Sequence, residues 1–159
     1  MVTGRVLARG VWLAAVAAAC ASEPGDPGGA VFGAWRVTGS ACPARCAISP
    51  GEAASWRGRA AGYSESVAHF ADNTCDRPRY EVAYWPAGDA VYGGARLGDL
   101  GIRGDSAMVV EVRCPPLERA GSDPRWDVPG GFLIVKDHEH MLMVWEGVYF
   151  ELTREQARR

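Results

Sequence analysis

The stretch of sequence that decides the fold is FLIVKDHEHMLMVWEGVYFELT, residues 132–153. Its two apolar runs, 132–136 and 141–145, flank the polar tetrad 137–140, and this arrangement predicts two strands joined by a hairpin turn. Val148, Phe150 and Leu152 then occupy alternate positions, as in a strand with one buried face. The C-terminal part of the chain is therefore predicted to be antiparallel β-structure.

Five segments nearer the N-terminus carry the same strand signals: residues 34–38, 59–63, 66–70, 79–85 and 108–114. Ser49-Pro50-Gly51-Glu52 has an N-cap serine, a proline at the first helical position and a glutamate at the third, which predicts a helix over 50–57 that ends at Gly58. Residues 71–74 are predicted to form a turn, and residues 95–100 one helical turn. The sequence thus predicts an all-β fold, an eight-stranded antiparallel barrel with one short helix after the first strand.

The N-terminus has the features of an export signal over residues 1–19. A basic region ends at Arg9, and the apolar residues 10–19 are too few to span about 30 Å of hydrocarbon. Val16-Ala17-Ala18-Ala19-Cys20 resembles the lipobox of bacterial lipoproteins, which implies that Cys20 becomes the lipidated N-terminus. Ordinary cleavage after an Ala-x-Ala motif is the alternative. Residues 20–30 are expected to form a Pro/Gly-rich tether, residues 31–154 the barrel, and residues 155–159 a polar tail.

The charge of the chain argues against nucleic-acid binding. Its 159 residues include 17 basic and 19 acidic ones, and removal of the signal would leave a net charge near −4 because Arg5 and Arg9 leave with it. No basic run occurs in the remainder, whereas a protein that tracks phosphates needs one. We expect no nucleic-acid partner, and contact with a membrane only through the lipid anchor.

Four cysteines remain when Cys20 is set aside, and an even number in an exported domain predicts two disulfides with three possible connectivities. Cys42 and Cys46 enclose three residues, so a local bridge is plausible. Cys75 and Cys114 would then close a loop of about 40 residues, worth about 3–4 kcal/mol in the chain-entropy model. A metal site or a redox pair is disfavoured, since Cys-x-x-x-Cys is not the thioredoxin spacing and no Cys-His cluster accompanies it.

Catalytic and metal-binding patterns are incomplete. His138-Glu139-His140 lies in the predicted hairpin turn, and His69 is the only other histidine, so a third metal ligand is lacking. Residues 62–66, GYSES, lack the final glycine of a nucleophile elbow and precede a predicted strand instead of a helix. We therefore expect a non-enzymatic protein without a metal or cofactor.

Apolar side chains of the last strands are the candidates for a ligand site. Those expected to line a barrel cavity are Phe132, Ile134, Leu142, Val144 and Phe150. Met141, Met143 and Trp145 would line a pocket or fill the core. Trp126 lies in a polar loop, where it would either contact a partner protein or fold back over the barrel mouth.

Gly33-Ala34-Trp35 at the first strand is similar to the Gly-x-Trp signature of lipocalins, and Arg154 closes the last strand. This resemblance implies that Trp35 and Arg154 meet in a cation–π contact at the barrel base. The chain also resembles small exported bacterial lipocalin-like proteins in four segments: residues 47–56, 75–80, 100–102 and 144–152. The resemblance implies a lipocalin-like barrel and leaves its function open.

We expect from these features an exported, lipid-anchored binding domain that holds a small apolar or amphipathic ligand in a β-barrel. The alternative is a protein-binding module of the cell envelope, such as an inhibitor that acts through its loops. The expected location is the outer membrane or cell envelope, and otherwise the periplasm or the medium.

Overall fold

A computed structural model describes residues 27–88, 94–115 and 126–156. Nine strands in these residues form one antiparallel sheet, in the order β4-β3-β2-β1-β9-β8-β7-β6-β5. The strands are β1 (Gly33–Ala41), β2 (Ala60–Tyr63), β3 (Val67–Phe70), β4 (Asn73–Asp76), β5 (Arg79–Pro86), β6 (Ser106–Arg113), β7 (Phe132–Val135), β8 (His140–Trp145) and β9 (Val148–Arg154). The stretch 132–153 supplies the three consecutive strands β7, β8 and β9, as its pattern predicts.

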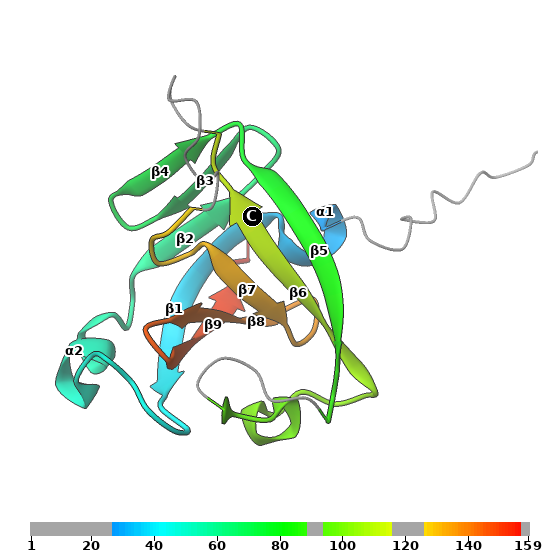
Figure 1. The fold of residues 1–159 in the computed structure, drawn as a ribbon. Helices are drawn as coiled ribbons and strands as arrows, with labels where there is room; N and C mark the ends of the chain where they lie inside the picture. The colour runs from blue at the N-terminus through cyan, green and yellow to red at the C-terminus, as the bar shows by residue number, and fades with distance from the viewer. Residues whose placement is uncertain (1–26, 89–93, 116–125, 157–159) are drawn as a thin grey trace, which may run out of the picture.

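The sheet curls into a half-barrel whose two edges, β4 and β5, follow each other in the chain (Figure 1). The antiparallel β-fold is confirmed, but the prediction of eight strands is wrong for the described residues. The additional strand is β4, which the sequence analysis assigned in part to a turn. Asn73 and Asp76 have low strand propensity, and the strand forms because it pairs with β3 from Val67↔Asp76 to Phe70↔Asn73.

Two disulfides join the cysteines in the pairing favoured by their spacing, Cys42–Cys46 and Cys75–Cys114. The first closes a small loop directly after β1. The second ties the edge strand β4 to the residue that follows β6. Paired cysteines of this kind are typical of proteins exported to an oxidising compartment.

Short helices in the described residues flank the sheet: α1 (Gly28–Val31), α2 (Pro50–Ser55) and the 3₁₀-helix η2 (Leu97–Leu100). The hydroxyl of Ser49 accepts a hydrogen bond from the backbone N–H of Glu52 at 3.2 Å, as expected of an N-cap serine. The helix α2 ends at Ser55, two residues before its predicted end. Gly58 follows it with a φ of 89°, a conformation that favours glycine.

The helix α1 shortens the expected tether of residues 20–30. Gly28 to Ala30 belong to this helix, and the carbonyl of Ala30 accepts a hydrogen bond from Arg154 at 2.8 Å. The indole N–H of Trp35 donates to the carbonyl of Val31, also at 2.8 Å. The signal region and Cys20 lie outside the described residues. Within those residues, no helix has the length and apolar character needed to cross a membrane.

Two hydrophobic clusters pack on opposite faces of β7, β8 and β9. The cluster inside the curl contains large, fully buried side chains, among them Trp35, Phe70 and Phe150. Met141 and Met143 belong to this cluster, so they fill the core. The second cluster lies on the outer face, where Leu97, Leu100 and Ile102 of the η2 segment cover the sheet. Strands 132–135 and 140–145 are thus buried on both faces, which explains their nearly continuous apolar sequence.

Candidate ligand-binding cleft

A cleft of about 600 Å³ opens where β7 begins and β8 ends. Its volume falls within the range of small-molecule sites, about 300–1,000 Å³. The apolar lining comes from both hydrophobic clusters: Trp126, Val128 and Trp145 pack with the inner one, and Phe132 and Val144 with the outer one. The remaining lining residues are Arg45, Cys46, Ala47, Glu111, Asp127, Gly131, Glu146 and Gly147.

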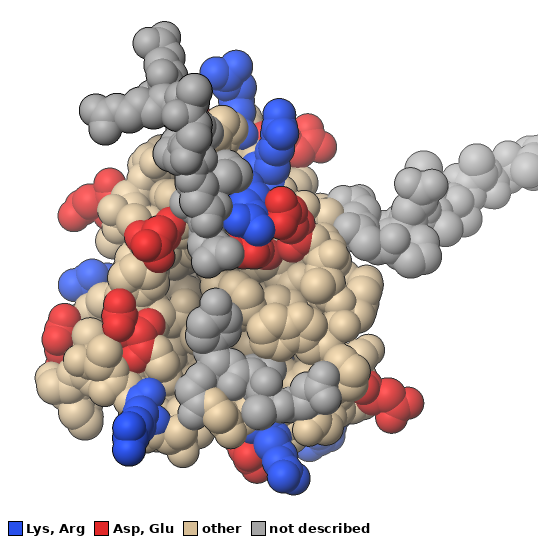
Figure 2. Space-filling view, viewed as in Figure 1, with Lys and Arg blue, Asp and Glu red and all other residues tan. Residues whose placement is uncertain are grey.

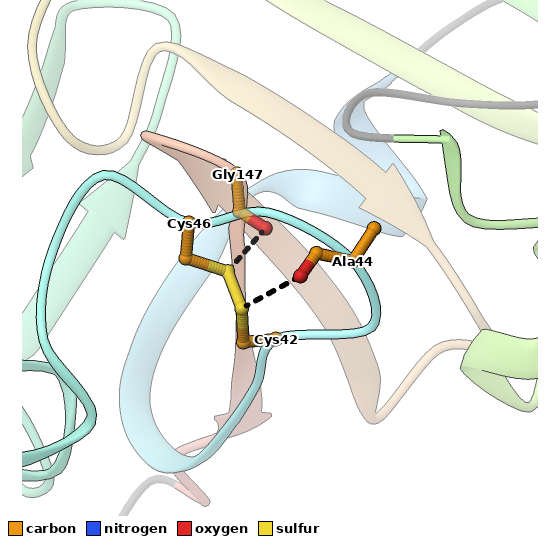
Figure 3. Close-up of a disulfide and its surroundings, with 4 residues drawn as sticks. All are labelled: Cys42, Ala44, Cys46 and Gly147. Atoms are coloured by element: carbon orange, nitrogen blue, oxygen red, sulfur yellow. Dashed lines mark hydrogen bonds between the residues drawn. A yellow bond between two sulfur atoms is a disulfide. The ribbon is translucent and has the colours of Figure 1, made fainter.

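One wall of the cleft is the disulfide loop 42–47, which docks on the turn between β8 and β9. The backbone N–H of Ala47 donates to the carbonyl of Glu146 at 2.8 Å. Figure 3 shows the Cys42–Cys46 disulfide beside this turn, with Sγ of Cys46 at 3.2 Å from the carbonyl oxygen of Gly147. A Cβ at Gly147 would overlap the carbonyl oxygen of Arg45, so the close approach of loop and turn requires glycine.

The opposite wall is the segment from Trp126 to Gly131. The backbone N–H of Trp126 donates to the carbonyl of Val112 at 3.1 Å, and the phenol of Tyr63 donates to the carbonyl of Gly130, also at 3.1 Å. Burial raises the pKa of the Tyr63 phenol well above its usual range, because the phenolate would be desolvated there. A Cβ at Gly131 would overlap the carbonyl oxygen of Trp126. These contacts fix the wall from inside the core.

The polar lining includes three carboxylates and one guanidinium group among the residues that the structure describes. Glu111 is half-buried and accepts a hydrogen bond from Arg113 at 3.0 Å, in an ion pair that extends to Glu81 at 2.8 Å. Asp127, Glu146 and Arg45 have exposed side chains. The cleft therefore combines an apolar floor with a charged rim, which is the arrangement expected for an amphipathic ligand.

The five side chains expected to line a barrel cavity do not share one face. Phe132 and Val144 reach the cleft, whereas Ile134 and Leu142 are buried beneath the η2 segment. Phe150 lies inside the curl and stacks on Trp56, with ring centroids 4.5 Å apart. The expected lining is therefore corrected. The interior is packed by aromatic side chains, and the cleft is at the rim.

Trp126 is only 7% exposed, so the interpretation that it is an exposed anchor for a partner protein is wrong. It folds back onto the core, as the alternative interpretation held, and one part of the side chain lines the cleft. The sequence analysis missed most of the other lining residues, including Arg45, Glu111 and Glu146. Their segments are far apart in the chain, and the only local signal was the Glu146-Gly147 dipeptide between two strand patterns.

Trp35 and Arg154, the residues expected at the barrel base, are in contact. The guanidinium carbon of Arg154 lies 4.2 Å from the centroid of the Trp35 ring. The same side chain donates to the carbonyls of Phe32 and His138, both at 2.6 Å. Gly33 leaves the space for it, since a Cβ there would lie 2.6 Å from Nη1. Arg154 thus fastens α1 to the end of β9.

The side chains of the histidine-rich turn, residues 137–140, make hydrogen bonds within the turn itself. Asp137 accepts hydrogen bonds from the backbone N–H groups of Glu139 and His140, both at 2.8 Å, and its carboxylate lies 3.0 Å from Nδ1 of His140. His69 lies elsewhere, on β3 over Gly62 of β2. No group of three potential metal ligands occurs in the part of the chain that the structure describes.

Charges of both signs alternate around the face shown in Figure 2, and no basic patch gathers on it.

Comparisons of the chain with protein-family models, with curated proteins and with solved structures give no match.

Proposed function

We propose that this chain is an exported, lipid-anchored, non-enzymatic domain that binds a small apolar or amphipathic molecule. The observation that carries the proposal is the cleft of about 600 Å³, with three aromatic rings from Trp126, Phe132 and Trp145 in its lining. Aromatic and aliphatic side chains supply most of the contact area in small-molecule sites, and a few polar groups orient the ligand. The site lies at the rim of the half-barrel instead of in its interior.

The lipocalin-like character of the fold belongs to this proposal. It is supported by the curled antiparallel sheet and by the contact of Trp35 with Arg154 at the end where the chain enters the sheet. Anchoring through Cys20 rests on the sequence, and the two disulfides are consistent with export. The alternative of a protein-binding envelope module rested on exposed loops that carry Trp126 and the Cys42–Cys46 bridge. The burial of Trp126 argues against the first of these two features.

The first test is native mass spectrometry of the full chain carrying Cys20→Ser, exported to a bacterial periplasm and purified without detergent. We expect an added mass that survives gentle ionisation and disappears on unfolding. Trp145→Ala removes an aromatic wall of the cleft and should reduce the retained mass. Tyr84→Ala, which removes a 52%-exposed aromatic side chain of β5 outside the cleft, should leave it unchanged. Equal retention by both variants would place the ligand elsewhere.

A further inference from the structure

We propose that the cleft selects a cation: an amphiphile whose head is a protonated amine or a quaternary ammonium group. This inference rests on the proposed function and names the ligand class of the same site. It follows from the charge of the rim and from the position of the rim charges relative to the aromatic rings.

The charges on the rim are unequal. Among the described residues of the lining, Glu111, Asp127 and Glu146 carry carboxylates, and Arg45 carries a guanidinium group. The half-buried carboxylate of Glu111 is already compensated by Arg113 at 3.0 Å. Asp127 and Glu146 are exposed at the mouth of the cleft, and together they outnumber Arg45. An anionic head, such as a fatty-acid carboxylate, would meet net repulsion there, whereas a cationic head would be attracted.

The two rim carboxylates are each joined to a tryptophan of the lining. Asp127 follows Trp126 and Glu146 follows Trp145 in the chain, and all four residues line the cleft. Trp126 is almost fully buried, whereas Trp145 is partly exposed, so Trp145 is the indole that a cationic head could contact. Cation–π contact adds about 0.5–2 kcal/mol, and tryptophan is the strongest partner for it. Aromatic walls with nearby acids suit an ammonium group better than a neutral sugar or an anion.

The apolar part of the same ligand has its own surface. Val128, Phe132 and Val144 belong to the lining and carry no charge. Burial of an alkyl chain against them contributes about 0.8 kcal/mol per CH₂ group, irrespective of the head that the chain carries. Chain length thus sets the affinity, and the rim sets the preference among heads. These two contributions can be measured separately.

Three probes with the same ten-carbon chain separate them: decyltrimethylammonium, decyl maltoside and decanoate. Each is titrated calorimetrically, below its critical micelle concentration, into the full chain carrying Cys20→Ser. We expect the cation to bind about tenfold more tightly than the neutral probe, and decanoate to bind most weakly. The preference should shrink as salt is raised, because the rim charges are exposed to screening.

The double variant Asp127→Asn/Glu146→Gln should remove about tenfold in affinity for decyltrimethylammonium and leave decyl maltoside unchanged. Its control is Glu65→Gln/Asp72→Asn, which changes the net charge equally through two exposed carboxylates outside the cleft. That control should keep the cation preference. Loss of the preference in both variants would overturn the inference, since overall charge would then explain it.

The remaining outcomes distinguish this inference from the proposed function. Equal binding of the three probes would overturn the choice of a cation and leave a small-molecule carrier. Failure of all three probes to bind, together with no retained mass, would overturn both. Binding of a lysine-rich peptide without binding of decyltrimethylammonium would replace the small molecule with a protein partner.

Discussion

Replacement of Gly147 by alanine tests whether the turn between β8 and β9 holds the disulfide loop in place. Gly147 has a φ of 80°, where an L-residue costs about 1–2 kcal/mol. A Cβ at this position would also overlap the carbonyl oxygen of Arg45 and lie 3.3 Å from Cα of Cys46. Both atoms belong to the backbone, so the loop must move to admit the methyl group.

The displacement adds a second cost. It strains or breaks the hydrogen bond of 2.8 Å from Ala47 to Glu146, worth about 0.5–1.5 kcal/mol. Overpacking of this kind, with the strain on this hydrogen bond included, costs about 1–3 kcal/mol in addition to the backbone cost. Gly147→Ala should therefore lower the free energy of unfolding by about 2–5 kcal/mol in total. The loop also forms a wall of the cleft, so the affinity for a bound probe should fall as well.

Gly58→Ala is the matched control. Gly58 has a φ of 89°, and a Cβ there would meet no atom within 4 Å, so it carries only the backbone cost of about 1–2 kcal/mol. Urea unfolding followed by tryptophan fluorescence gives both values. Equal losses in the two variants would refute the argument that the turn and the loop are fitted to each other. Unchanged probe affinity in a folded Gly147→Ala variant would refute the role of the loop as a wall.

Three other perturbations test the fold. Arg154→Ala should destabilise the protein by about 2–4 kcal/mol, because three backbone carbonyls and the Trp35 ring lose their cationic partner. The control Arg36→Ala breaks an exposed ion pair with Glu155 and should cost less than about 1 kcal/mol. Equal losses of unfolding free energy for the two variants in urea would contradict this role of Arg154. Cys75→Ser/Cys114→Ser opens a loop with a sequence separation of 39 and should cost about 4 kcal/mol of unfolding free energy. Cys42→Ser/Cys46→Ser opens a loop with a separation of 4 and should cost about 2 kcal/mol. The reverse order in thermal unfolding would be inconsistent with a structural role for the longer bridge. Unfolded Tyr63 loses its proton above about pH 10 while the buried phenol keeps it, so Tyr63 should contribute up to about 1.4 kcal/mol per pH unit to the fall in the free energy of unfolding beyond pH 10. Tyr63→Phe should lessen the slope by that contribution, while Tyr80 and Tyr149, whose pKa values burial also raises, keep theirs.

The strand pattern and the number of disulfides were accessible from the sequence, because the first follows from short-range alternation and the second from an even count of cysteines. The connectivity of the cysteines was left open among three possibilities, and the structure decides it. Alternation at Val148, Phe150 and Leu152 marks one buried face, and the capped tetrad that begins at Ser49 marks the start of a helix. The short strand β4 escaped the analysis, since its residues have poor strand propensity and pair only because β3 lies beside them. The helix α1 was missed for a similar reason, since Arg154, from the opposite end of the chain, holds it together with the nearby Trp35.

Of the five residues predicted to line a ligand cavity, Phe132 and Val144 line the cleft, and the other three are packed elsewhere. In residues 132–135 and 141–144, every position is apolar. The alternation of apolar and polar residues that distinguishes the two faces of a strand is therefore absent from the sequence. The η2 segment covers one of these faces, and this packing decides that Ile134 and Leu142 are buried on the outer side while Met141 and Met143 are buried on the inner side. Nothing local distinguishes the two sets.

The sequence by itself determined the class of fold and the number of disulfides, because each follows from composition, spacing or short-range alternation. The tertiary structure decided where a ligand can bind. Four segments around residues 45–47, 111, 126–132 and 144–147 form the cleft, and only the curl of the sheet and the docking of the disulfide loop bring them together. A site built from contacts so distant in the chain has no local signature, since its geometry arises from packing.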